Sequence, residues 1–132
     1  MSVQAKRRAD YQPPAFSIAT VDLHITLHPT QTKVISTLSV TRNGAHDSPL
    51  VLDGDNLSLD SISINGTHLS DNEYTVTDSA LSVVTELDEF VLEITNTIAP
   101  EHNKALEGLY LSGGAYCTQC EAEGFRRITY FM

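Results

Sequence analysis

The sequence predicts an all-β fold, either an antiparallel β-sandwich or a saddle-like sheet, with short connections and little helix. Apolar and polar residues alternate at period two in several segments, which is typical of strands with one buried face. Turn dipeptides separate these segments, and no stretch of helical length carries a convincing 3.6-residue apolar period. Seven or eight strands within about 95 residues are typical of two packed antiparallel sheets.

The first fifteen residues are expected to form an irregular arm, because Pro13-Pro14 excludes a helix there. A strand with one apolar and one polar face follows and ends at Pro29, which predicts that the strand is half-buried. Its apolar face consists of Val21, Leu23, Ile25 and Leu27. A second strand is expected over residues 33–42, before the turn signal Asn43-Gly44. Its apolar face consists of Val34, Leu38 and Val40.

Shorter strands are expected between residues 50 and 83. Residues 50–52 run into a turn at Asp53-Gly54. In the next segment the apolar residues Leu57 and Leu59 stand at odd positions, and Ile62 and Ile64 stand at even positions. The apolar face therefore shifts by one residue, a change of parity, at Asp60-Ser61. Asn65-Gly66 is the strongest hairpin signal, because both residues tolerate positive φ in a type I′ turn.

Two further elements complete the predicted sheets. A second hairpin is expected around Asp78-Ser79, because apolar residues alternate on both sides of this dipeptide. The last strand of the sandwich presents Phe90, Leu92 and Ile94 on one face, and its other face carries Val91, Glu93 and Thr95.

Composition and charge exclude several classes of protein. The chain has 132 residues, with 8 Lys and Arg against 17 Asp and Glu, so its net charge is −9. This length fits one domain, and the acidic balance argues against binding to duplex nucleic acid. No apolar run approaches the roughly 20 residues that span a bilayer, so no membrane partner is expected. Residues 43–103 contain no Lys or Arg; they form either a solvated acidic face or a surface that attracts cations.

The composition changes over residues 104–132, where glycines and aromatic residues become frequent. Such residues either close a core or line a pocket. The run Ile128-Thr129-Tyr130-Phe131 resembles a strand, and Met132 follows it as at a natural C-terminus or at a cut inside a larger protein. In a cut chain, aromatic residues would be left in water and would promote self-association. These residues are Tyr116, Phe125, Tyr130 and Phe131.

The sequence contains no complete metal site. Its five histidines form no HExxH motif and no pair spaced for one helix face. Cys117 and Cys120 form a CxxC motif, but a structural zinc site needs further Cys or His ligands, and a redox pair needs a βαβ setting. Two buried or half-buried free thiols are expected instead, which fits a reducing, cytoplasmic compartment.

One polar cluster in the C-terminal segment carries groups that could bind a ligand or catalyse a reaction. If residues 119–123 are extended, then Gln119, Glu121 and Glu123 point to the same side. Paired carboxylates in this arrangement could bind a protonated amine through charge-assisted hydrogen bonds, or could act as acid and base. The alternative is a solvated strand edge without a ligand.

Residues 105–110, ALEGLY, and residues 117–126, CTQCEAEGFR, resemble the N-terminal domain of the M1, gluzincin-type zinc aminopeptidases. Asp10-Tyr11 and the start of the first strand at Val21 also fit that domain. The resemblance implies that residues 16–132 form a saddle-shaped β domain, which packs on a downstream catalytic domain beyond Met132. The zinc site and the GxMEN motif would lie in that catalytic domain, so the chain alone would contain no catalytic residue, bind no zinc and be inactive.

The resemblance also implies a role for two residues. Gln119 and Glu121 match a Gln-x-Glu pattern on a loop that reaches the catalytic cleft in this family. Glu121 would bind the free α-amino group of a peptide substrate, and Gln119 would help to form the pocket for the first side chain. Arg126 matches the pattern without an assigned role. The alternative hypothesis is a free-standing β-sandwich binding module that uses its acidic face.

Overall fold

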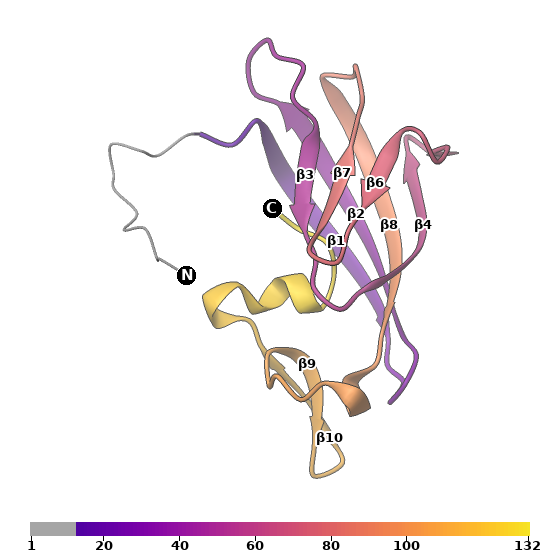
Figure 1. Ribbon diagram of the computed structural model, residues 1–132, viewed down its shortest axis with the longest axis vertical. Coiled ribbons are helices and arrows are strands. Elements are labelled where there is room, and N and C mark those ends of the chain that lie inside the picture. The colour runs from indigo at the N-terminus through magenta and orange to yellow at the C-terminus, as the bar shows by residue number, and fades with distance from the viewer. Residues whose placement is uncertain (1–12) are drawn as a thin grey trace.

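The computed structural model describes residues 13–132, except for the side chains of Ala122 and Glu123, and confirms the all-β prediction. Most of the predicted arm, with Asp10-Tyr11, lies outside the described residues. Two antiparallel sheets pack face to face (Figure 1). The larger sheet has the order β1-β2-β8-β4-β5. Its strands are β1 (Phe16–Thr26), β2 (Thr32–Arg42), β8 (Glu89–Ile98), β4 (Ser58–Ile64) and β5 (Thr67–His68).

The second sheet of the sandwich and the elements at the C-terminal end are shorter than the long strands of the larger sheet. The smaller sheet has the order β3-β7-β6 and consists of β3 (Leu50–Asp53), β7 (Ala80–Val83) and β6 (Tyr74–Val76). The 3₁₀ helix η2 (Pro100–His102) leads to the hairpin of β9 (Gly108–Ser112) and β10 (Ala115–Gln119). The 3₁₀ helix η3 (Glu121–Arg127) lies between this hairpin and the sandwich (Figure 1). No helix in the described part of the chain is long and apolar enough to cross a membrane.

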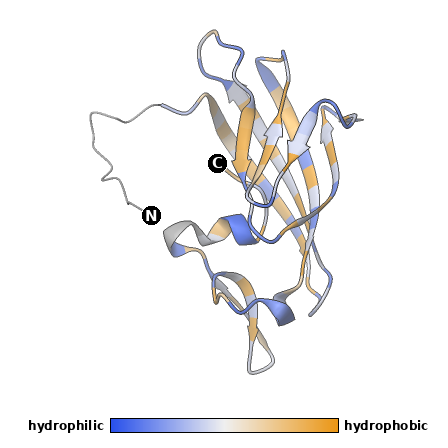
Figure 2. Cartoon of the chain, viewed as in Figure 1, coloured by the Kyte–Doolittle hydropathy of each residue, from blue (hydrophilic) through white to orange (hydrophobic). Residues whose placement is uncertain are grey.

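The core lies between the two sheets and follows the predicted alternation. Figure 2 shows apolar bands along the sandwich strands. The inner face of the larger sheet buries Leu38, Val40, Phe90, Leu92 and Ile94, and the smaller sheet contributes Leu50, Leu52, Leu81 and Val83. Complete burial of one such side chain contributes about 1.5–3 kcal/mol, so this alternation accounts for the packing of one sheet on the other.

The turns and the parity shift were also predicted correctly. Asn65 and Gly66 have φ values of 51° and 85° and join β4 to β5, as a type I′ turn requires. The register of β4 against β8 shifts between Leu59 and Ser61, at the place where the apolar face changes parity. The second predicted hairpin is β6–β7.

The first strand departs from the half-buried prediction. The register pairs Val21 with Leu38 and Ile25 with Val34, so the apolar side chains of β1 do extend the core face of the sheet. However, Val21, Leu23 and Ile25 are about 40% exposed and Leu27 is 51% exposed. Alternation predicts which side chains share a face, but burial also requires a covering layer. Phe16 at the start of β1 is buried in the core, whereas the part of β1 from Val21 onward lies beyond the covering layer among the described residues.

The C-terminal segment also differs from the predicted strand. Only Phe131 of the run Ile128–Phe131 makes a ladder contact, an isolated bridge to Asp53. Tyr130 is buried in the core, where its ring leaves no room for a Cβ at Gly54. Phe125 and Phe131 are half-buried and pack edge to face with ring centroids 5.4 Å apart. The expectation that all four tail aromatics face water is therefore wrong, and Tyr116 is the exposed one of the four.

Tyr130 makes stability sensitive to alkaline pH. Burial raises the pKa of its phenol above the ordinary value of 10.0. The pKa of the Tyr130 phenol is higher in the folded chain than in the unfolded chain, so the stability that its burial contributes is complete below about pH 10. This stability is lost as the pH rises further, because the phenol ionises first in the unfolded chain. We expect Tyr130→Phe to move the midpoint of alkaline unfolding to higher pH, as measured by circular dichroism. Tyr74→Phe is the control, and an equal shift in both variants would contradict the prediction.

Candidate functional site

Gln119 and Glu121 lie on either side of the sharp turn that joins β10 to η3. Gln119 is the last residue of β10 and Glu121 is the first residue of η3. Both residues are exposed, and Gln119 Oε1 accepts a hydrogen bond from the backbone N–H of Glu121 at 3.1 Å. The structure therefore brings the two predicted site residues together at the surface.

Residues 119–123 do not form the extended segment that the shared side of Gln119, Glu121 and Glu123 would require. The chain turns into η3 at Glu121, and the N–H of Gly124 donates to the carbonyl oxygen of Cys120 at 3.2 Å. Gly124 permits this turn, because a Cβ there would lie 2.5 Å from the backbone oxygen of Gln119. Residue 123 belongs to η3, so the strand rule that alternate residues share one side does not apply to this segment.

A buried asparagine holds the segment after η3 against the larger sheet. Asn96 on β8 donates from Nδ2 to the carbonyl oxygen of Ile128 at 2.9 Å. Its Oδ1 accepts a hydrogen bond from Thr129 Oγ1 at 2.7 Å. Both Asn96 and Thr129 are almost completely buried. Sequence reasoning did not identify Asn96, although a polar residue at an inward position of an apolar strand was the available signal.

Arg127, at the end of η3, was also missed. Its Nη2 lies 3.0 Å from Asp55 Oδ2, and its Nε lies 3.1 Å from Glu107 Oε2. Asp55 belongs to the loop after β3 in the sandwich, and its backbone N–H donates to the carbonyl oxygen of Arg126 at 2.9 Å. Side-chain and backbone bonds therefore join the site segment to the sandwich.

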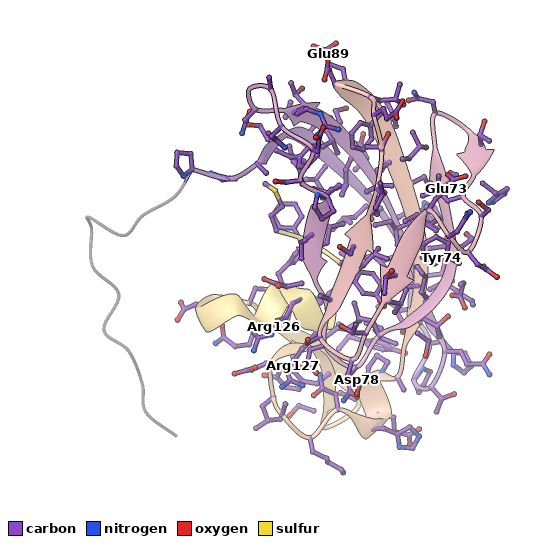
Figure 3. The ribbon with its side chains drawn as sticks, turned by 45° about the horizontal axis from the view of Figure 1, so that its top comes forward. Glu73, Tyr74, Asp78, Glu89, Arg126 and Arg127 are labelled. Carbon is purple, nitrogen blue, oxygen red and sulfur yellow. The ribbon has the colours of Figure 1, made fainter. Side chains whose placement is uncertain are left out.

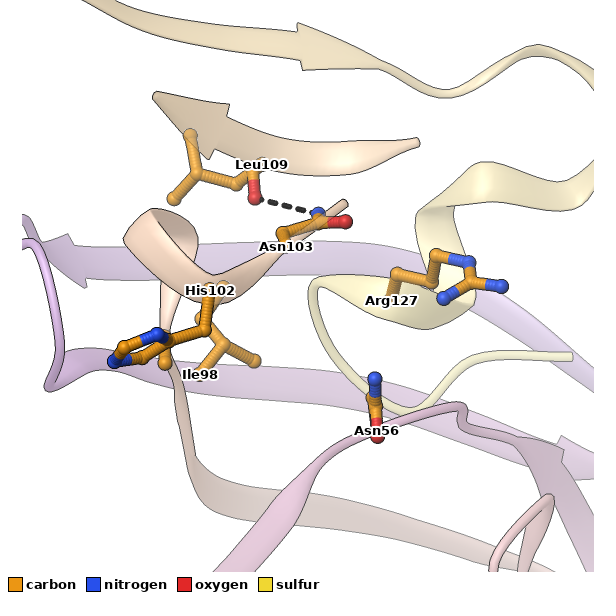
Figure 4. A pocket seen from close by; sticks show the side chains of 7 residues that line it. Asn56, Ile98, His102, Asn103, Leu109 and Arg127 are labelled. Carbon is orange, nitrogen blue, oxygen red and sulfur yellow. Dashed lines mark hydrogen bonds between the residues drawn. The ribbon is translucent and has the colours of Figure 1, made fainter. Parts of the chain in front are cut away.

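A small cavity of about 210 Å³ lies beside Arg127, between η2 and the loop that contains Asn56 (Figure 4). It is lined by Asn56, Ile98, Ala99, His102, Asn103, Leu109 and Arg127. Asn103 Nδ2 donates to the carbonyl oxygens of Glu107 at 2.7 Å and Leu109 at 2.9 Å, which orders the loop before β9. Neither Gln119 nor Glu121 lines this cavity, and both are exposed, so the candidate site lies on an open surface of the chain.

The described residues do not fit a zinc ion. Among them, no group of three or more His, Cys, Asp or Glu side chains is close enough to hold a metal. Cys117 and Cys120 are both free thiols. Cys117 is half-buried on β10, as expected, whereas Cys120 is exposed, so the expected burial is wrong for Cys120.

Acidic residues of the stretch 43–103 lie in different parts of the sandwich. Figure 3 shows Glu89 at one end of the sandwich, Glu73 at its side and Asp78 near Arg126 and Arg127. Asp53, Asp55 and Asp78 line a shallow depression together with Arg126, so part of the acidic stretch faces basic residues of η3.

Comparison with known proteins gives a consistent set of relatives. The chain is 52% identical over 128 residues to aminopeptidase N of Caulobacter vibrioides and 44% identical over 132 residues to aminopeptidase N of Escherichia coli. These alignments cover 97% and 98% of this chain but only 15% of each relative, so the chain spans about 15% of their length. No protein-family model matches the sequence.

Solved structures agree with the sequence relatives. Aminopeptidase A of Legionella pneumophila, solved in complex with aspartic acid, superposes with a TM-score of 0.84 at 32% identity and covers 96% of this chain and 15% of its own. The M1 zinc metallopeptidase of Deinococcus radiodurans shares the fold with a TM-score of 0.71 at 19% identity, over 89% of this chain and 29% of its own. Sequence and fold together show that the chain is similar over nearly its whole length to an N-terminal β domain of the aminopeptidase N type.

Proposed function

We propose that this chain is the N-terminal domain of a longer cytoplasmic zinc aminopeptidase, and that it supplies the loop that anchors the α-amino group of the peptide substrate. The observation that carries the proposal is the exposed turn of Gln119 and Glu121, whose segment is held to the sandwich. The chain that contains this turn is 52% identical to aminopeptidase N of Caulobacter vibrioides. In this proposal the zinc ligands and the catalytic residues come from the rest of the protein, so the chain alone catalyses no hydrolysis.

The chemistry of the turn fits recognition of a peptide N-terminus. The carboxylate of Glu121 can accept charge-assisted hydrogen bonds from an ammonium group, which a peptide bond inside a chain lacks. The amide oxygen of Gln119 already accepts the N–H of Glu121, which leaves its NH₂ group to donate to a substrate carbonyl. Because both side chains are exposed, a second surface must cover them before water is excluded and the ammonium–carboxylate pair becomes strong.

A chimeric enzyme tests the proposal. The matching segment of Caulobacter vibrioides aminopeptidase N is replaced by this chain, and the hydrolysis of alanine 4-nitroanilide is measured. We expect the chimera to be active and the 132-residue chain alone to be inactive. A chimera that folds and binds zinc without peptidase activity would contradict the proposal, as would peptidase activity of the chain alone.

The uncovered face of β1 is the part of the sandwich that fits the downstream domain. Val21, Leu23 and Ile25 form an apolar stripe on this strand. A groove of about 320 Å³ continues the stripe and is lined by Ile25, Leu27, Leu109, Tyr116, Thr118 and Ile128. An exposed apolar surface of this kind marks an interaction site, and we propose that the rest of the longer protein covers it.

The isolated chain should self-associate through the same stripe. We expect the apparent mass in sedimentation velocity to rise with concentration for the unmodified chain, and to stay near that of one chain for Leu23→Lys. His24→Lys places the same charge on the opposite face of β1 and should leave the self-association in place. Equal effects of both substitutions, or a monomer at every concentration, would contradict this use of the stripe.

A further inference from the structure

The turn that carries Gln119 and Glu121 has little packing of its own. β9 and β10 form a separate sheet of two strands, and a two-stranded hairpin is at best marginally stable in water. Residues 118–121 are all exposed. The position of the turn therefore depends on the contacts that hold the hairpin to η3 and to the sandwich.

Two glycines allow η3 to lie directly against the hairpin. Gly108 on β9 is the register partner of Gln119, and Gly124 lies within η3. A Cβ at Gly108 would lie 2.7 Å from the Cβ of Arg127, and a Cβ at Gly124 would lie 2.5 Å from the backbone oxygen of Gln119. The backbone of the turn is thus in direct contact with the helix that ends at Arg127.

The guanidinium of Arg127 makes ionic contacts with two other segments at once, in addition to the hydrogen bonds of Asn96 and the apolar packing around Ile128 that also hold the segment after η3. Asp55 comes from the sandwich, Glu107 from the loop before β9, and Arg127 from η3; the N···O distances are 3.0 and 3.1 Å. The side chain of Arg127 is 21% exposed, so water screens these pairs less than it screens pairs on an open surface. Its planar fork bonds two carboxylates at once, which a lysine ammonium cannot do with the same geometry.

We propose that Arg127 is a positioning residue for the substrate-anchoring turn: through Glu107 and Asp55 it fixes η3, and with it Glu121, relative to the sandwich. This inference rests on the proposed function. It assigns a role to a residue that does not touch the substrate. Replacement of Arg127 should therefore affect catalysis through Glu121, and it should increase the mobility of the β9–β10 hairpin without increasing that of the core.

Enzyme kinetics in the chimera test this role. We expect Arg127→Ala to lower kcat/KM about tenfold, and Arg127→Lys to recover little of the loss. In a Glu121→Ala background the same Arg127→Ala substitution should have almost no further effect, because both residues act on one contact. Lys33→Gln, which breaks the Lys33–Asp60 pair on the larger sheet, is the control and should leave kcat/KM unchanged.

Amide hydrogen exchange of the 132-residue chain provides a readout apart from activity. Arg127→Ala should speed exchange about tenfold or more in peptides covering residues 108–124, and should leave β2 and β8 unchanged. Faster exchange in all peptides would show a merely structural role for Arg127 and overturn the inference. A tenfold loss of kcat/KM on Arg127→Ala that persists in the Glu121→Ala background would overturn it as well. If Glu121→Ala itself has no effect, the proposed function fails; if it has an effect but Arg127→Ala does not, only this inference fails.

Discussion

Replacement of Glu121 by alanine in the chimeric enzyme should lower kcat/KM for substrates with a free α-amino group by about 100-fold or more. A loss of this size corresponds to about 2.7 kcal/mol of transition-state stabilisation, which is within the range for a charge-assisted hydrogen bond in a site that excludes water. Glu121 is exposed in this chain. The expected effect therefore appears only where a second surface covers it, and the chimera is the suitable setting for the measurement.

The matched control is Glu101→Ala. Glu101 is likewise an exposed glutamate in a 3₁₀ helix, but it lies in η2, away from the turn, so its replacement should leave kcat/KM unchanged. A second comparison uses a substrate that lacks the α-amino group, whose slow hydrolysis Glu121→Ala should leave unaffected. Near-normal kinetics of Glu121→Ala with the amino substrate would remove this residue from the mechanism.

Much of the sandwich could be predicted because its strands carry strong local signals. Alternation identified the faces of β2 and β8, and Asn65-Gly66 specified a turn that requires positive φ at both residues. The same signal placed Val21, Leu23 and Ile25 on the core face but could not predict their exposure. Whether a layer covers β1 depends on residues distant in sequence, and alternation within one strand carries no information about them.

The candidate site was only partly predictable for a related reason. Gln119 and Glu121 were identified by their resemblance to a family pattern, whereas the turn between them depends on a contact between Gly124 and the backbone of Gln119. Arg127 pairs with Asp55, which is 72 residues away in the sequence, and no short-range pattern connects the two. The residues that hold the site in place therefore required the tertiary structure.

Replacement of Asn96 by alanine should lower the free energy of unfolding of the 132-residue chain by about 3 kcal/mol. The substitution removes two hydrogen bonds and leaves the carbonyl oxygen of Ile128 and the hydroxyl of Thr129 without their partner in a buried place. An unsatisfied buried polar group costs about 1–3 kcal/mol, and the cavity left by the amide adds to that cost. Urea denaturation followed by circular dichroism measures the change.

Asn72→Ala is the control, because Asn72 is exposed in the loop before β6 and its replacement should change stability by less than about 0.5 kcal/mol. A double-mutant cycle with Thr129→Val isolates the Asn96–Thr129 bond, and we expect the two losses to be strongly non-additive. Additive losses would show that the Asn96–Thr129 bond contributes little to stability and that the effect of Asn96 comes from its bond to Ile128 or from packing. Non-additive losses would show that one buried amide on β8 connects the core to the segment carrying η3, so that mutations in the core and at the candidate site are energetically coupled.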